Sequence, residues 1–259
     1  MDTACYFGGS CPRLRPRSLK TKLLSGAVAL FSAVLALPAS AAVITVPLDN
    51  DMTIADLRTF TNGGNYPIAP TTLNVGGVPF DLVRHGTTPD SLGVVFPVGA
   101  VPEFIITTPP VVGVTKVYTL INSGAGEAGA INAYLDFYGS GGAYVRFPLT
   151  QGTNIRDHYD GSYNNSITDP NIVTENFGGG VRLDRQTFEL PAVFDTATLL
   201  EVRLVGGPDV GSPAGDAFLA GLTLETVSAI PEPGSAAALA VLLTSSLTLH
   251  RRRKKTAAA

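Results

Sequence analysis

The chain has 259 residues, with 18 basic and 21 acidic side chains and a formal net charge of −3. The charge is unevenly distributed, because ten of the basic residues lie within the first 22 residues and in Arg251–Lys255. Residues 42–230 keep eight basic and 19 acidic residues and are therefore strongly acidic. Nucleic acid is not an expected partner of such a surface, because phosphate binding needs clustered Lys and Arg.

The N-terminus has the three parts of a secretory signal peptide in order. Five basic residues precede the apolar run Leu23–Leu37, and the small residues of Pro38–Ala42 follow it. We expect signal peptidase to cleave after Ala41 or Ala42, so residues 1–41 form the leader. The alternative is a transmembrane anchor, for which a run of fifteen residues is short.

The sequence of residues 42–228 predicts a single all-β domain. Ile131–Tyr138 and Leu200–Leu204 alternate apolar and polar side chains with the period of two that is typical of strands. Both cysteines lie in the leader, so an apolar core and no disulfide must hold this domain together. The other predicted strands are Val43–Val46, Val78–Val83, Glu103–Thr107, Val114–Ile121, Ala143–Leu149, Val181–Leu190 and Ala217–Glu225. Short strands separated by Gly and Pro turns indicate an antiparallel β-sandwich.

Gly124–Gly129 reads G-x-G-x-x-G, the pattern of a dinucleotide-binding loop. That use requires a helix after the loop, whose N-terminus receives the pyrophosphate. Because the strand Ile131–Tyr138 follows instead, the sequence predicts a hairpin loop and no nucleotide site.

Several segments of the middle region resemble the galactose-binding-like jelly-roll modules found beside bacterial glycoside hydrolases. They read NVGGVPFDLV, KVYTLINSG, AYVRFPLTQGTNIRD and LAGLTLET, and the third contains Pro148-Leu149 followed by Gly152–Asp157. The resemblance implies a jelly-roll sandwich. The chain departs from the pattern at Tyr138–Gly141, where an Asp-containing hairpin is common, and at His158, where Trp is frequent.

The segment RDHYDGSYNNSITDPN is rich in oxygen-bearing side chains. Asp157, Asp160 and Asp169 could contribute to the six to eight oxygen ligands that calcium takes, although their spacing is not that of an EF-hand. The alternative is a solvated loop whose Asp and Asn side chains bond their own backbone. Calcium is the one cofactor that this pattern suggests.

The same segment contains candidates for sugar binding. His158, Tyr159 and Tyr163 join Asp157 and Asp160 in a possible ligand loop. The chain has no Trp, so a sugar-stacking platform must be built from Tyr. The strand tyrosines that could also contribute are Tyr134, Tyr138 and Tyr144. Half-buried strand tyrosines with a packing role explain these residues equally well.

Catalysis is not expected. Residues 42–230 contain two histidines and no cysteine, and neither H-E-x-x-H nor G-x-S-x-G occurs. The 19 acidic residues could provide a glycosidase pair, but sequence alone does not place them.

The C-terminal segment differs from both the leader and the predicted β domain. Pro231-Glu232-Pro233 precedes the apolar run Ser235–Leu249, which as a helix would span ~22 Å and is marginal for a hydrocarbon core of about 30 Å. Arg251–Lys255 would stay on the cytoplasmic side of the inner membrane. The two prolines keep the preceding stretch extended, which favours cleavage by a protease.

Residues 229–255 resemble the PEP-CTERM sorting signal of Gram-negative bacteria. The matching parts are Pro231, Glu232 and Pro233, the apolar run, and Arg251, Arg252 and Arg253. The resemblance implies an exosortase as partner, and release or transfer of the protein to the cell surface. An ordinary C-terminal tail anchor is the alternative.

Together these patterns predict an exported protein with one non-catalytic sandwich that binds or organises extracellular polysaccharide. A structural envelope or matrix protein without a small ligand is the first alternative, and a cryptic glycoside hydrolase is the second.

Overall fold

A computed structural model of the chain describes residues 41–48, 55–68, 72–85, 92–95, 103–209 and 215–227. These residues all belong to one compact unit, Ser40–Ala229. The predicted signal peptide before Ala41, the Pro-Glu-Pro motif, the apolar run and the basic tail lie outside the described residues. Among those described, no helix has the length and apolar character needed to cross a membrane.

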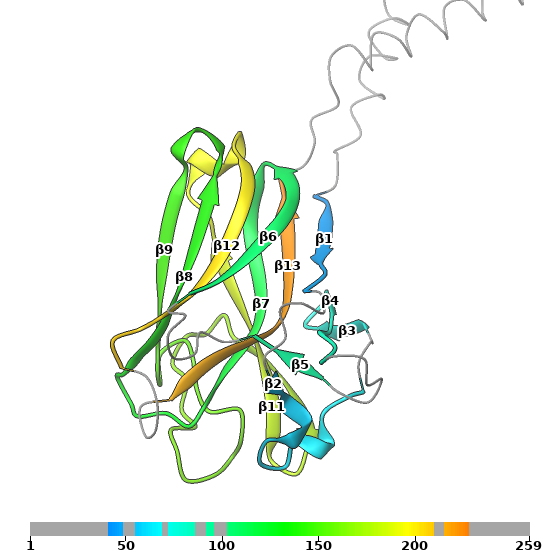
Figure 1. The fold of residues 1–259 in the computed structure, drawn as a ribbon, viewed down its shortest axis with the longest axis vertical. Helices are drawn as coiled ribbons and strands as arrows, with labels where there is room; N and C mark the ends of the chain where they lie inside the picture. Colours follow the sequence, from blue (N-terminus) through cyan, green and yellow to red (C-terminus); the bar gives the residue numbers. More distant parts are fainter. Residues whose placement is uncertain are drawn as a thin grey trace, which may run out of the picture. The chain divides into compact units, whose positions relative to one another are not determined.

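The described residues form an all-β, antiparallel, sandwich-like structure of two main sheets (Figure 1). The five-stranded sheet has the order β1-β13-β7-β11-β10 and the four-stranded sheet the order β6-β12-β8-β9. The strands of the first are β1 Val43–Val46, β7 Val114–Gly124, β10 Val173–Gly178, β11 Val181–Glu189 and β13 Asp216–Thr226. Those of the second are β6 Glu103–Val112, β8 Ile131–Gly139, β9 Tyr144–Thr150 and β12 Thr198–Gly206. Every strand expected from the sequence is present, and β10 was not expected.

Two further strand pairs lie between β1 and β6. They are β2 Ala55–Asp56 with β5 Gly93–Val94, and β3 Thr72–Val75 with β4 Val78–Asp81. The turn between β3 and β4 is made by Gly76 and Gly77, both of which have a positive φ that L side chains rarely adopt. Four short 3₁₀ helices complete the described secondary structure: η1 Leu57–Thr59, η2 Gly63–Asn65, η3 Ser140–Gly142 and η4 Ala192–Asp195.

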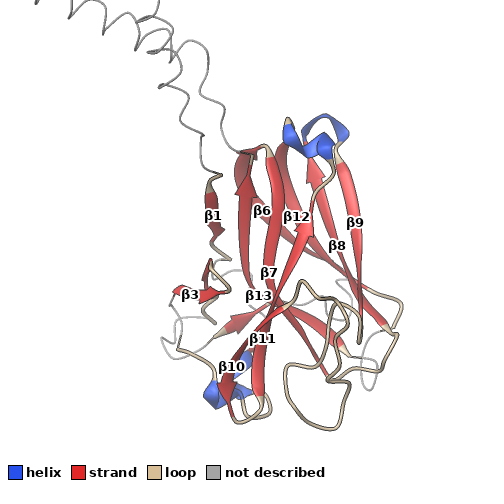
Figure 2. Ribbon diagram, turned by 180° about the vertical axis from the view of Figure 1, so that it is seen from behind, coloured by secondary structure: helices blue, strands red, loops and turns tan. Residues whose placement is uncertain are grey.

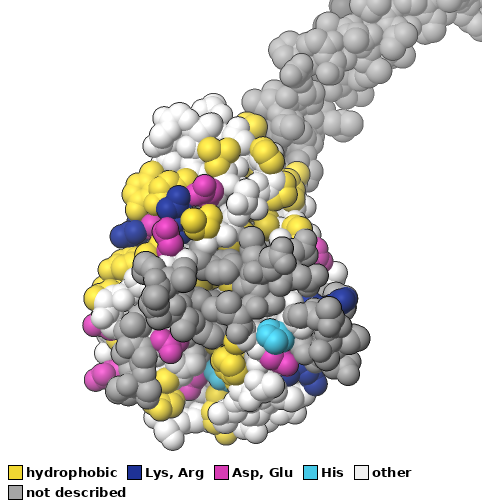
Figure 3. All heavy atoms as spheres, in the orientation of Figure 1, with side chains coloured by type: hydrophobic (Ala, Val, Ile, Leu, Met, Phe, Trp, Pro, Cys, Tyr) yellow, Lys and Arg dark blue, Asp and Glu magenta, His cyan; other side chains and the backbone are white. Residues whose placement is uncertain are grey.

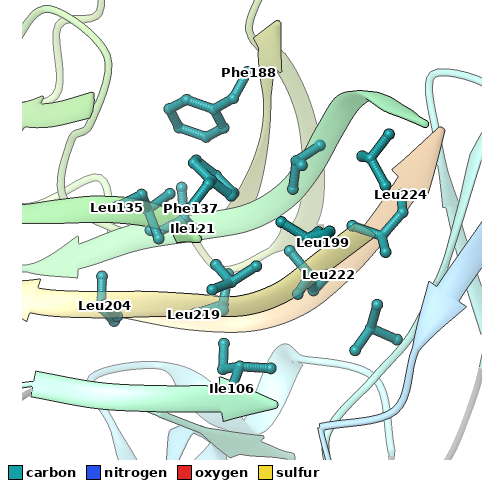
Figure 4. Close-up of a cluster of buried hydrophobic side chains, with 14 of the residues drawn as sticks. Ile106, Ile121, Leu135, Phe137, Phe188, Leu199, Leu204, Leu219, Leu222 and Leu224 are labelled. Atoms are coloured by element: carbon teal, nitrogen blue, oxygen red, sulfur yellow. The ribbon is translucent and has the colours of Figure 1, made fainter. Parts of the chain in front are cut away.

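The main core fills the space between the two sheets. Side chains at alternate positions of the strands meet there, as period-two patterning requires (Figure 4). Leu135 and Phe137 come from β8 and Leu204 from β12, and they face Ile121 and Leu219 of the opposite sheet. All five are fully buried, and burial of one face only explains why β8 and β12 alternate apolar and polar residues.

A second core covers the other face of the five-stranded sheet. Leu57, Tyr66 and Phe80, from the segment between β1 and β5, pack with Leu120 of β7 and Phe218 of β13. The central strands are therefore buried on both faces. This double burial explains the nearly continuous apolar run of β13, whose residues from Ala217 to Leu224 are all buried.

The G-x-G-x-x-G loop connects the two sheets. β7 before it belongs to the five-stranded sheet and β8 after it to the four-stranded sheet, so the expected hairpin is wrong. The strand β8 follows the loop, as the sequence indicated. A Cβ on Gly126 would lie 2.5 Å from the amide of Gln151, so this glycine permits the close approach of β9's end to the loop.

Candidate functional site

The predicted ligand loop is built into the five-stranded sheet. β7 pairs with β11 only from Arg185 to Glu189, because the other half of β11 diverges from it. Residues 156–160 fill that gap. The backbone N–H of His158 donates to Ser123 O of β7 at 2.9 Å, and that of Arg182 of β11 donates to His158 O at 2.9 Å. The segment therefore acts as an inserted strand, and Figure 2 shows the long loop to which it belongs beside the ends of β10 and β11.

A buried ion pair holds this loop in place. Arg156 donates to both carboxylate oxygens of Asp184, from Nε at 2.7 Å and from Nη2 at 2.8 Å. Asn122 Nδ2 and Thr174 Oγ1 donate to the same carboxylate at 2.8 and 2.7 Å. The Asp184 side chain is 1% exposed, so its charge is compensated by these four hydrogen bonds and not by water.

His158 is a core residue. It is 4% exposed and contacts Phe60, Tyr66 and Phe218. The Tyr66 hydroxyl lies 3.0 Å from Arg182 O, which can only accept, and 2.9 Å from His158 Nδ1. The consistent assignment is that Tyr66 donates to the carbonyl and His158 Nδ1–H donates to Tyr66. Burial, with a smaller contribution from Arg182, lowers the pKa of His158 to about 4. The ring is thus neutral at pH 7.

The three aspartates proposed for calcium lie in different environments. Asp157 is 2% exposed, and burial raises the pKa of its carboxyl. Asp160 N donates to Gly180 O at 2.9 Å, whereas Asp169 Oδ1 accepts from Asn171 N at 2.9 Å in a local turn. Within the described ranges, no three His, Cys, Asp or Glu side chains are placed to hold a metal ion.

Calcium binding by this loop stays a prediction, and chelation tests it. If Asp157 and Asp160 bind calcium, EDTA should lower the melting temperature of residues 40–229, because the ion would stabilise the folded state only. The measurement is thermal unfolding in the presence of EDTA or of calcium. A free calcium concentration about 100-fold above Kd would stabilise the folded state by about 2.7 kcal/mol. A calcium-dependent rise in melting temperature that is lost in Asp160→Asn would establish the site.

The exposed part of the loop begins at Asp160, after the buried residues Asp157 and His158. Tyr159 packs against the second core, and only Tyr163 presents a largely exposed ring, at 42% exposure. Of the five residues in the predicted ligand loop, the structure thus buries Asp157 and His158 and half-buries Tyr159. The segment has a clear role in stabilising the sandwich.

The strand tyrosines, in contrast, lie together on the outer face of the four-stranded sheet. β8 pairs with β9 so that Tyr138 is opposite Tyr144 and Tyr134 opposite Pro148. The rings of Tyr138 and Tyr144 have centroids 5.0 Å apart, and Tyr144 is 47% exposed. We call the outward side chains of β6, β12, β8 and β9 the tyrosine face.

Charged residues occupy the middle of the tyrosine face. Asp136 lies between Arg203 of β12 and Arg146 of β9 in the cross-strand register. Arg146 donates to both carboxylate oxygens of Asp136, each at 2.6 Å, and this hydrogen bonding raises the pKa of Arg146 above its usual range. The Asp136 side chain is 1% exposed, but that of Arg146 is 44% exposed.

Both arginines also contact aromatic rings. The Arg146 guanidinium lies 4.7 Å from the centroid of Tyr134, and that of Arg203 lies 4.4 Å from the centroid of Tyr138. Arg203 additionally pairs with Glu201 at 2.7 Å and with Glu103 at 3.3 Å. Figure 3 shows cationic, acidic and apolar side chains gathered over β8 and β12. The result is an ordered surface with exposed hydrogen-bonding groups beside aromatic rings.

The sequence pointed to the tyrosines of this face but not to Asp136, Arg146, Arg203, Glu201 or Glu103. Each of these residues occupies a polar position of an alternating strand, and the alternation places it on the outward side. Which strands are neighbours, and in which register, is a long-range property that no local pattern contains. Comparisons with protein-family models and with curated proteins find no match for this chain.

Proposed function

We propose that the sandwich is a non-catalytic module that binds extracellular polysaccharide through the tyrosine face. The observation that carries this proposal is the cross-strand cluster of Tyr138 and Tyr144 beside the exposed guanidinium of Arg146. A tyrosine ring offers an apolar surface to the C–H face of a sugar, and its hydroxyl offers a hydrogen bond at the rim. Arginine and glutamate side chains supply oriented partners for sugar hydroxyls.

The charges of the face favour a neutral glycan over an acidic one. Two arginines stand among three carboxylates, and the arginines already pair with Asp136, Glu201 and Glu103. A uronate or sulfate ester would have to displace one of these carboxylates from its arginine. A neutral chain needs only to add hydrogen bonds to the existing network.

Residues 229–255 give the proposal its cellular setting. We propose that the precursor is anchored in the inner membrane after signal peptidase cleavage, and that an exosortase then cuts it at the Pro-Glu-Pro signal. The product would act at the cell surface or in the extracellular matrix. The support is the order of Pro231–Pro233, the apolar run and Arg251–Arg253 in the sequence.

Processing is tested by replacing Glu232 with Ala in cells that contain an exosortase. We expect membrane-bound precursor to accumulate, because the variant loses the only charged group of the motif. Intact-mass measurement should find that the mature wild-type protein lacks Arg251–Lys255. An uncut tail in the wild-type protein would contradict the sorting proposal.

Glycan binding is tested with Tyr138→Ala and Tyr144→Ala. We expect each change to weaken binding about tenfold, because truncating an aromatic anchor at a binding surface costs about 1–2 kcal/mol. The measurement is isothermal titration of residues 40–229 with the neutral polysaccharide that most raises the melting temperature in a panel. Tyr163→Ala is the matched control, since it removes an exposed tyrosine of the loop and should leave the affinity unchanged.

The same panel separates the alternatives. Flat melting curves with every glycan, together with concentration-dependent assembly, would favour a structural matrix protein. Release of reducing ends would indicate a glycoside hydrolase.

A further inference from the structure

At one end of strand β11, no described strand pairs with its outer side. β10 pairs with β11 from Gly178↔Val181 to Val173↔Arg185, and this pairing ends there. β11 continues to Glu189 and pairs with β7 on its inner side only. Among the described strands, none occupies the outer side of Thr187 and Glu189. We call the segment after Arg185, residues 186–189, the open end of β11.

The chain before β10 turns away from this edge for a local reason. Pro170 has no N–H to donate, and the N–H of Asn171 is bound by Asp169 Oδ1 at 2.9 Å. The N–H of Ile172 faces Asp169 O at 3.4 Å in the same turn. The N–H of Asn171, which would have extended the ladder, is therefore used within the turn.

The backbone of the open end is oriented for strand pairing. Leu190 N donates to Thr115 O at 2.8 Å, so the even-numbered residues of this part of β11 direct their N–H and C=O toward β7. Successive residues of a strand direct these groups to opposite edges. The N–H and C=O of Thr187 and Glu189 therefore face the vacant side, where an added strand would receive them.

A groove of about 430 Å³ lies along this edge. Its lining residues are Pro170, Asn171, Val173, Arg185, Thr187 and Glu189. The groove has a cation at one end and a carboxylate at the other. Arg185 is held by its Nη1, which donates to Gly76 O at 3.0 Å, and its guanidinium lies 5.5 Å from the centroid of Tyr118. Its side chain forms no ion pair with any carboxylate in the described part of the chain.

We propose that the open end of β11 binds an extended peptide with the pattern Lys-x-Glu as an additional antiparallel strand. The peptide would continue the line of β10 upstream of Val173, so its Glu lies opposite Thr187 and next to Arg185. Its Lys, two residues earlier, lies opposite Glu189. Main-chain hydrogen bonds to Thr187 supply affinity, and the two charge pairs supply orientation and selectivity. This peptide site is separate from the tyrosine face and does not depend on glycan binding.

The probe is the peptide Thr-Val-Lys-Val-Glu-amide with a fluorophore on its N-terminal amine, and its control has the same composition with Lys and Glu exchanged. Binding to the full chain in detergent is measured by fluorescence anisotropy of N-terminally labelled peptides. We expect the exchanged peptide to bind about tenfold more weakly, because both charge pairs become like-charge contacts. In Arg185→Glu the preference should shift toward the exchanged peptide.

Two tests address the backbone ladder. N-methylation of the peptide's Glu should abolish binding, since that N–H would donate to Thr187 O, whereas N-methylation of the preceding Val should not. In the protein, Thr187→Pro should abolish binding with little loss of stability, because Thr187 N–H does not face β7. The experiment with N-methylated peptides uses the wild-type protein. It therefore tests the ladder even where the proline variant does not fold.

Equal binding of the two peptides, no binding of either, or indifference to the position of N-methylation would overturn the proposal. A concentration-dependent dimer that Thr187→Pro dissociates, without peptide binding, would assign the open end to a second copy of the chain instead.

Discussion

Replacing Asp184 with Asn is expected to lower the free energy of unfolding by about 3–5 kcal/mol, because it leaves Arg156 without its partner in a buried site. The carboxylate accepts hydrogen bonds from Arg156, Asn122 and Thr174, and an amide cannot accept all of them with the same geometry. The effect should extend to the loop that Arg156 holds. Urea unfolding at pH 7, followed by circular dichroism, gives the midpoint and slope from which this loss is obtained.

The matched control is Glu201→Gln, which removes a carboxylate from the ion pair with Arg203. Both side chains of that pair are partly exposed, at 34% and 25%, so the change should cost about 1 kcal/mol or less. Proteolysis should report the same difference, with faster cleavage near residues 161–168 in the Asp184 variant only. An Asp184→Asn variant as stable as the control would show that the buried pair does not hold the loop.

Acidification is expected to destabilise the domain through His158. Its pKa is about 4 in the folded protein and 6.5 in an unperturbed chain, so the unfolded state binds a proton at a higher pH. The contribution of neutral His158 to the free energy of unfolding is fully present above pH 6.5 and is lost as the pH falls toward 4. The difference between the two pKa values corresponds to about 3 kcal/mol. Free energies of unfolding measured between pH 4 and pH 7.5 give this slope.

Asp157 gives stability the opposite pH dependence, so its effect must be measured separately from that of His158. Burial raises the pKa of its carboxyl, so the folded state retains that proton to a higher pH than the unfolded state. Its contribution is present below the unfolded pKa of about 3.9 and is lost as the pH rises through the folded value. His158→Asn should flatten the slope between pH 4 and 6.5, and Asp157→Asn should steepen it. A wild-type slope in His158→Asn would assign the acid sensitivity to another group.

The strand pattern was readable because it is local. Strands such as β8 and β12 have one face in the core and one in solvent, so alternation reports their burial directly. β10 escaped prediction because its sequence, VTENFG, has polar residues at its centre and lies at the edge of the sheet. The second core was also missed, since it depends on residues 55–95 folding over a sheet whose strands are far away in sequence.

The loop around His158 illustrates a different limit of prediction from sequence. Its Asp, His, Tyr and Asn residues have the composition of a ligand loop, and the same side chains serve equally well as partners for a buried backbone. Which role applies depends on the divergence of β7 from β11, which creates the gap that residues 156–160 fill. That divergence concerns two strands that are far apart in the sequence, so no local pattern reports it.

The sequence by itself determined the class of the domain, most of its strands and the tyrosines available for stacking, because period-two burial and residue chemistry are local properties. Only the tertiary structure decided that Tyr138 and Tyr144 are adjacent, that Arg146 is paired with Asp136, and that His158 is neutral. These properties follow from strand order and register, which bring together residues that are remote in the chain. The open end of β11 belongs to the same category, because the extent to which the described strands pair is a feature of the assembled sheet.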